Sequence, residues 1–226
     1  MFAGFLNDVS CRWQFQLHLF HPKCPFQYRL HDKHAFVHSS TAGDATILSS
    51  LRIRTARVAI LTRLAEQIGE TCNIALPERD GMIYIDRVET KWPLRIQQPI
   101  GTRVPFYCTA SGKLYLSSLG TQHLERYAHA AKFEQFTAKT LNTTQSLIKE
   151  IKAVRANGFA TDNEEFMEGM IAVGVPILVS HARLVSTLSF HALVQRLTME
   201  DAIEHFHVLK LAATSLSALV TGENER

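Results

Sequence analysis

The sequence lacks the features of a membrane protein, a disulfide-stabilised secreted protein and a disordered chain. Its four cysteines are spread over 226 residues, so we expect no disulfide framework and a reducing, cytoplasmic setting. No apolar run approaches the roughly 18 residues of a membrane span, and no basic segment precedes an apolar one as in a secretory signal. With 46% hydrophobic and 20% charged residues, the composition also excludes collagen-like and coiled-coil chains. A globular, soluble protein remains.

Neither sign of charge is in large excess. The chain has 24 Lys and Arg against 21 Asp and Glu, a net charge of +3. Residues 1–54 hold six of the basic and three of the acidic residues, so residues 55–226 hold 18 of each and are neutral. Such a mild excess does not by itself indicate nucleic-acid binding.

Common catalytic and metal-binding patterns are missing as well. The sequence contains neither a Gly-x-Ser-x-Gly nucleophile motif nor a phosphate loop of Walker spacing. Cys11, His18, His21 and Cys24 are possible metal ligands, but their spacing does not match a zinc finger. We therefore expect no enzyme activity, no metal site and no cofactor.

Hydrophobic periodicity predicts the secondary structure. Residues 46–69 show one apolar helix face, and strands over 71–76 and 82–88 form a hairpin with Asp80-Gly81 in the turn. An extended stretch at 93–98 comes next. The later elements are helices at 109–120, 121–131 and 141–156, strands at 159–163, 171–179 and 184–191, and one long helix from Thr198. Strands grouped in runs indicate an α+β fold with a largely antiparallel sheet, and a parallel doubly wound sheet is less favoured.

Three local motifs accompany this order of elements. They are LAEQIGETCN at 64–73, IGTRVP at 100–105 followed by CTASGK at 108–113, and GFATDNEE at 158–165 followed by VGVP at 173–176. In order and spacing they resemble the effector-binding domain of IclR-type bacterial transcriptional regulators, over roughly residues 55–220.

The resemblance implies a GAF-like effector domain. Its curved, mostly antiparallel sheet would have about six strands flanked by helices and would be preceded by a linker helix. The chain would then divide into an irregular segment at 1–45, the linker helix at 46–69 and the effector-binding domain at 70–226. The implied partners are a small organic or aromatic acid, operator DNA and further copies of the chain in a homodimer or tetramer.

Two functions follow from the resemblance. In the first, the bound acid modulates operator binding. Relatives carry a winged helix-turn-helix ahead of the linker helix, but residues 1–54 show no three-helix pattern, so we expect that unit to be truncated or replaced. The alternative is therefore an effector-binding module that has no DNA-binding activity of its own and acts through oligomerisation.

The predicted effector site begins at Thr109-Ala110-Ser111-Gly112. A segment that opens a helix presents free backbone N–H groups at the positive end of the helix dipole, which suits a carboxylate. An ordinary capped helix start explains the same residues without a ligand.

The resemblance adds further residues to this site. Asp162 and Ala172 match positions that line the effector cavity in relatives. Thr187 and Ser189 share one strand face and would supply hydroxyl groups, although a polar outer face explains them equally well. Trp92 is either a lid over the pocket or a partly buried loop residue. Arg95 and Arg103 are candidates for a carboxylate clamp or are solvated surface residues.

Overall fold

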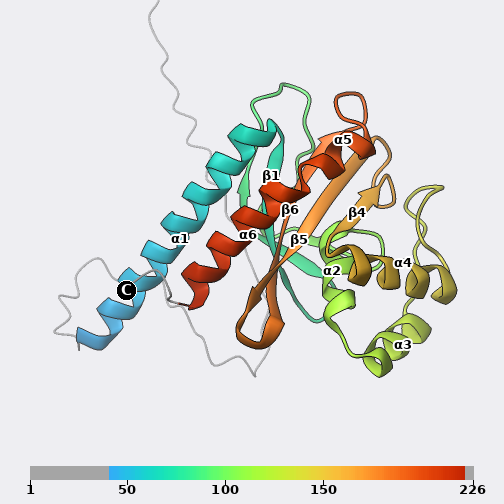
Figure 1. Ribbon diagram of the computed structural model, residues 1–226, viewed down its shortest axis with the longest axis horizontal. Coiled ribbons are helices and arrows are strands. Elements are labelled where there is room, and N and C mark those ends of the chain that lie inside the picture. Colours follow the sequence, from blue (N-terminus) through green and yellow to red (C-terminus); the bar gives the residue numbers. More distant parts are fainter. Residues whose placement is uncertain (1–40, 222–226) are drawn as a thin grey trace, which may run out of the picture. The chain divides into compact units, whose positions relative to one another are not determined.

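The computed structural model of the protein describes residues 41–221, with side chains from residue 51 onward. Residues 1–40 and 222–226 lie outside the described part, and so does most of the N-terminal segment predicted for residues 1–45. Figure 1 shows the arrangement of the described elements. They are, in chain order, α1 (Thr41–Ile68), β1 (Thr71–Pro77), β2 (Met82–Val88), β3 (Arg103–Val104), α2 (Ala110–Ser118), α3 (Thr121–Ala130), α4 (Thr144–Asn157), β4 (Ala160–Asn163), β5 (Met170–Val179), a 3-10 turn (Ser180–Ala182), β6 (Arg183–Leu193), α5 (Met199–Glu204) and α6 (Phe206–Thr221).

The strands form one curled six-stranded sheet in the order β3-β2-β1-β6-β5-β4. Every neighbouring pair is antiparallel. The register places Arg87, Asn73 and Ser189 next to one another across β2, β1 and β6. One row along, Asp162 lies beside Ala172, which lies beside His191. Residues of five different strands therefore share one patch of the sheet.

Alternating side chains give the sheet two different faces. On β6, Leu188, Phe190 and Ala192 belong to an apolar core with α1 and α6, and we call this face the outer face. The intervening residues Thr187, Ser189 and His191 point to the opposite, inner face and are buried too. Both faces are covered, but the outer face is mainly apolar and the inner face carries a row of buried polar side chains.

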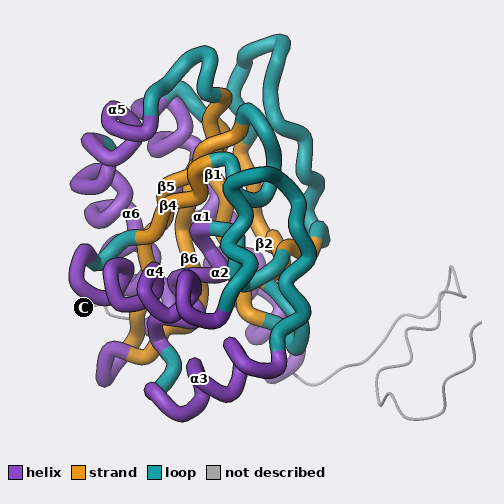
Figure 2. Tube along the Cα trace, turned by 90° about the vertical axis from the view of Figure 1, so that its right-hand side faces the viewer, coloured by secondary structure: helices purple, strands orange, loops and turns teal. Residues whose placement is uncertain are grey.

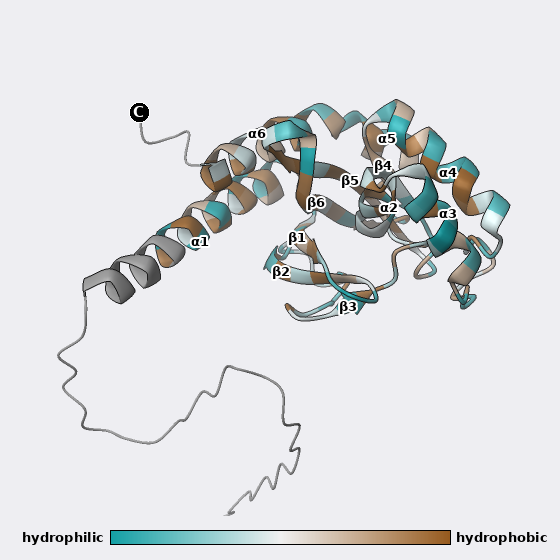
Figure 3. Ribbon diagram, turned by 90° about the horizontal axis from the view of Figure 1, so that it is seen from below, coloured by the Kyte–Doolittle hydropathy of each residue, from teal (hydrophilic) through white to brown (hydrophobic). Residues whose placement is uncertain are grey.

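Two helices cover the outer face. α1 and α6 contact each other, and Figure 3 shows α6 lying beside α1 along this side of the sheet. Leu61 and Leu64 of α1 and Leu209 of α6 are buried in the shared core. An ion pair adds to this packing, because Arg57 Nε of α1 lies 2.7 Å from the buried Asp86 Oδ2 of β2.

The inner face is covered by α2, which packs against β5 and β6 and is backed by α4 (Figure 2). Thr109 caps α2 by accepting a hydrogen bond from Gly112 N–H. A Cβ atom at Gly112 would overlap the backbone of Phe106, so glycine allows the segment before the helix to lie against its first turn. The helix is thus held with its N-terminus over the polar patch of the sheet.

Most of the predicted elements are confirmed. The hairpin, α2, α3 and the three later strands lie within one or two residues of their predicted positions, and α4 ends as expected at Asn157-Gly158, with Gly158 at φ 75°. The first helix begins at Thr41, five residues before the predicted start at 46. None of the described helices is long and apolar enough to cross a membrane.

Two predictions about elements were wrong. The stretch 93–98 is a loop, because Pro93 cannot donate to a strand ladder and the carbonyl of Ile96 accepts a hydrogen bond from the Arg87 side chain instead. The helix predicted from Thr198 is two helices, α5 and α6, which are separated at His205. The His205 ring packs edge-on against Phe190 of the sheet, with 5.8 Å between ring centroids.

Candidate effector site

The N-terminus of α2 provides the anion-binding end of the candidate site. Ala110 and Ser111 are the first two helical residues, so their N–H groups have no acceptor within the helix. The N–H of Gly112 is different, because Thr109 Oγ1 accepts it at 3.1 Å. Two backbone donors at the positive end of the helix dipole therefore remain for a ligand.

Hydroxyl groups from the sheet lie directly below this helix end. Ser111 Oγ is 3.4 Å from Ser189 Oγ of β6, and both side chains are buried. Thr187, two residues before Ser189, has its hydroxyl 3.5 Å from the carbonyl oxygen of Ala75. Ala172 lies on the neighbouring strand and adds only a methyl group. The structure thus brings together residues 111, 172, 187 and 189.

Asp162 completes this group from the edge strand β4. Its Oδ1 accepts hydrogen bonds from the N–H groups of Glu165, at 2.8 Å, and Phe166, at 3.3 Å. Burial and the nearby Glu165 carboxylate nevertheless raise the pKa of Asp162 to about 7, although Lys113 and the two backbone donors act in the other direction. Near neutral pH, Asp162 is therefore divided between its neutral and its charged form.

A buried lysine holds the same region from inside. Lys113 of α2 is fully buried, and its Nζ lies 2.6 Å from Glu165 Oε1 and 3.0 Å from Glu150 Oε1 of α4. Burial alone would lower the pKa of Lys113, but the two carboxylates outweigh it and raise that pKa. Lys113 therefore stays charged and links α2 to α4 and to the loop after β4.

A second polar cluster lies beside the first, on β1, β2 and β6. Arg87 Nη1 donates to Asn73 Oδ1 at 2.8 Å, and Tyr84 Oη is 3.4 Å from His191 Nε2. All four side chains are at least nine-tenths buried. Asn73 Nδ2 and His191 Nδ1 have no hydrogen-bond partner among the described residues. Burial, with the Arg87 charge, lowers the pKa of His191 to about 3, so its imidazole is neutral.

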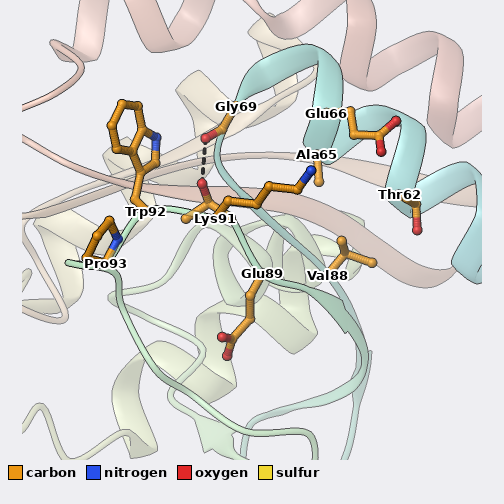
Figure 4. Close-up of a pocket in the computed structure, with 10 residues that line it drawn as sticks. Thr62, Ala65, Glu66, Gly69, Val88, Glu89, Lys91, Trp92 and Pro93 are labelled. Carbon is orange, nitrogen blue, oxygen red and sulfur yellow. Dashed lines mark hydrogen bonds between the residues drawn. The ribbon is translucent and has the colours of Figure 1, made fainter.

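Trp92 belongs to a different hollow. Figure 4 shows it with Lys91 and Pro93 of the loop after β2, opposite Thr62, Ala65 and Glu66 of α1. This hollow has a volume of about 590 Å³, and its lining includes none of the buried polar residues of the inner face. The guanidinium carbon of Arg196 lies 5.5 Å from the centre of the Trp92 ring, and half of the Trp92 surface is exposed.

The comparisons with known proteins agree with this architecture. The family described as bacterial transcriptional regulator IclR C-terminal matches residues 45–218. The chain belongs to the IclR family. It is 35% identical to the probable transcriptional regulator SauR of Cupriavidus necator over 191 residues, which cover 79% of this chain and 76% of SauR. It is 30% identical to the Pca regulon regulatory protein of Pseudomonas putida, with 74% of this chain and 58% of that protein covered.

Solved IclR-type structures share the fold. The Thermotoga maritima IclR structure superposes with a TM-score of 0.69 at 28% identity, covering 77% of this chain and 72% of that one. An IclR homologue from Microbacterium hydrocarbonoxydans, complexed with 4-hydroxybenzoate, has a TM-score of 0.66 at 17% identity and 75% and 68% coverage. A double mutant of the inducer-binding domain of PobR from Acinetobacter, complexed with 3-hydroxybenzoic acid, has a TM-score of 0.65 at 22% identity and 71% and 94% coverage.

Family membership confirms the expectations for fold and class. The relatives of this IclR-family chain are named transcriptional regulators and not enzymes.

The two arginines considered as a carboxylate clamp each pair with a surface carboxylate. Arg95 Nε lies 2.6 Å from Glu89 Oε2, and Arg103 Nη2 lies 2.6 Å from Glu78 Oε2. Among the described residues, no group of His, Cys, Asp and Glu side chains is arranged to hold a metal ion.

Several polar residues of the inner face were missed in the sequence. Asn73 interrupts an apolar strand, and His191 continues the alternate spacing of Thr187 and Ser189. Both patterns were available signals for this IclR-type site. No such signal marked Lys113, because a lysine inside a short amphipathic helix ordinarily faces solvent.

Replacing Lys113 by methionine should destabilise the domain by about 3–5 kcal/mol, because Glu165 would remain buried without its cationic partner. Urea unfolding monitored by circular dichroism measures the change. Adding Glu165→Gln to Lys113→Met should restore part of the stability, since the buried charge is then removed.

The matched control is Lys139→Ala, which removes the exposed ion pair of Lys139 with Glu164. It should leave the unfolding midpoint nearly unchanged, because exposed ion pairs contribute little. Equal effects of the two lysine variants would show that the buried contact does not stabilise the fold.

Proposed function

We propose that this chain is a ligand-sensing transcriptional regulator of the IclR type, in which a small organic or aromatic acid binds on the inner face of the sheet. The observation that carries the proposal is the Ser111–Ser189 contact beneath the N-terminus of α2. There, two buried hydroxyl groups lie at the helix end that begins with the N–H groups of Ala110 and Ser111. A carboxylate accepts hydrogen bonds from all of these donors, and the helix dipole favours its charge.

The surrounding residues support a bound acid. Ala172 is buried beside these groups and contributes only a methyl group, the smallest side chain other than glycine. Asp162 would repel an anion when it is ionised, but its raised pKa makes the neutral form accessible near pH 7. Two proteins of the same fold hold hydroxybenzoates, which supports the capacity of this architecture for small acids.

Binding of the acid would shift the chain between two arrangements of a homodimer or tetramer and so change its access to operator DNA. Lys113 connects the binding end of α2 to α4 and to the loop after β4. α1, which the family resemblance identifies as the linker helix, packs on the opposite face of the same sheet. A change at the inner face thus reaches α1 through the strands that both sides share.

Isothermal titration calorimetry with a panel of small carboxylic acids tests the binding site. Ser111→Ala should weaken binding of a responsive acid about five- to tenfold, because one hydrogen bond to a charged acceptor is lost. Ser118→Ala, an exposed serine in the same helix, should leave the affinity unchanged. The proposal fails if no acid in the panel binds, or if the two serine variants behave alike.

The affinity of the acid should fall about tenfold as the pH rises from 6 to 8. Asp162, with a pKa of about 7, is mostly neutral at pH 6 and mostly ionised at pH 8, where it repels the bound carboxylate. Asp162→Asn should remove this dependence and keep the affinity near its pH 6 value at both pH values. If the Asp162→Asn variant keeps the same pH dependence of affinity, a titrating group other than Asp162 causes that dependence.

Operator binding is tested by a gel-shift experiment at physiological salt with DNA from upstream of the gene. A specific shift that the acid strengthens or releases is expected for a regulator, and competitor DNA separates specific from electrostatic binding. The absence of a specific shift would favour the alternative, an effector-binding module that acts through oligomerisation. Light scattering with and without the acid then measures the oligomeric state.

A further inference from the structure

Two buried polar atoms on the inner face have no hydrogen-bond partner in the part of the chain that the structure describes, and both lie beside the acid-binding end of the proposed site. They are Asn73 Nδ2 and His191 Nδ1, on side chains that are 0% and 4% exposed. Leaving a buried polar group without a hydrogen bond costs free energy, so such atoms mark a place where a ligand group completes the structure. From these two atoms we propose that the effector is a short aliphatic dicarboxylate, the second carboxylate of which binds here. This inference rests on the proposed function.

The free atom of Asn73 is a donor. Arg87 Nη1 donates to Asn73 Oδ1 at 2.8 Å, and a guanidinium has no acceptor atom, so this contact fixes which end of the amide faces Arg87. The NH₂ group of Asn73 therefore points elsewhere with its protons unused. It can bind only an acceptor, such as a carboxylate oxygen.

The proposal assigns the free atom of His191 as a donor too. Tyr84 Oη lies 3.4 Å from His191 Nε2, a contact that either tautomer of the imidazole can make, and we infer the arrangement in which the hydroxyl donates to Nε2. The neutral imidazole carries a single proton, which then lies on Nδ1. Two donors from two neighbouring strands are thus available to the same acceptor group.

The charge of this cluster favours an anion. The Arg87 side chain is only 3% exposed, and its Nε lies 3.4 Å from one carboxylate oxygen, Glu89 Oε1. Glu89 is closer to Arg95, at 2.6 Å, so a single carboxylate serves two guanidinium groups. The positive charge of Arg87 is therefore only partly neutralised, and a second carboxylate on the ligand would offset the remainder.

The register fixes the length of the ligand. Asn73 and Ser189 are directly paired across β1 and β6, which separates their side chains by about 5 Å, and His191 is the diagonal neighbour of Asn73. The first carboxylate lies at Ser189, under the N-terminus of α2. A chain of three or four carbon atoms, with bonds of about 1.5 Å, spans the two ends, as in malonate or succinate.

Calorimetry of the full chain with succinate, butyrate and 4-hydroxybenzoate tests this assignment. Succinate should bind at least tenfold more tightly than butyrate, which has the same carbon chain but one carboxylate. Asn73→Ala and His191→Ala should each reduce that ratio to below threefold while leaving the butyrate affinity within about twofold. Asn163→Ala, which changes an exposed asparagine on β4, should leave the ratio unchanged. Thermal unfolding by circular dichroism verifies that each variant is folded.

The outcomes separate this inference from the proposed function. If butyrate or 4-hydroxybenzoate binds as tightly as succinate, the two-ended ligand is overturned, but the acid-binding site stands. Equal losses of succinate and butyrate affinity in both Asn73→Ala and His191→Ala would also overturn it, because these residues would then only support the fold. If none of the three acids binds, the inference is overturned, and the wider panel of acids decides the proposed function.

Discussion

The structure depends on burying both faces of one antiparallel sheet. The outer face is buried mainly by apolar side chains, which α1 and α6 pack against Ile74, Val173 and Phe190. The inner face is different, because Asn73, Ser189, His191 and Asp162 lie on it and are withdrawn from water. A buried polar face is stable only when its groups are hydrogen-bonded to one another or to something bound there. This requirement makes the inner face the candidate effector site.

The cover over the inner face is held by polar contacts as much as by packing. Lys113 inserts its charge between Glu150 and Glu165, and Thr109 caps the helix while it donates to the carbonyl of Pro105. Such contacts position the N-terminus of α2 over Ser189. Because breaking a buried ion pair is costly, the helix end is restricted in orientation, and its free backbone donors are held in place.

The candidate site was only partly predictable from the sequence, and the reason differs between residues. Thr109, Ser111 and Asp162 stood in local motifs that resemble a known family, so their neighbourhood in sequence already marked them. Asn73, Arg87, Tyr84 and His191 come from three separate strands, and what joins them is the register of β1 with β2 and β6. No local pattern encodes that register. The position of Trp92 has no local signal either. The structure places it beside α1, at a hollow apart from the inner face.

The sequence by itself determined the α+β class, most element boundaries and the family, because periodicity, caps and short motifs are local properties of the chain. Two features of the secondary structure, the helix break at His205 and the loop at 93–98, were not predicted, because they depend on contacts with residues far away in the sequence. Only the tertiary structure decided which polar residues are buried together, that Lys113 is internal and that Asp162 has a raised pKa. Burial and charge–charge distance are properties of the packed sheet, and residues far apart in the chain acquire them only when the strands pair.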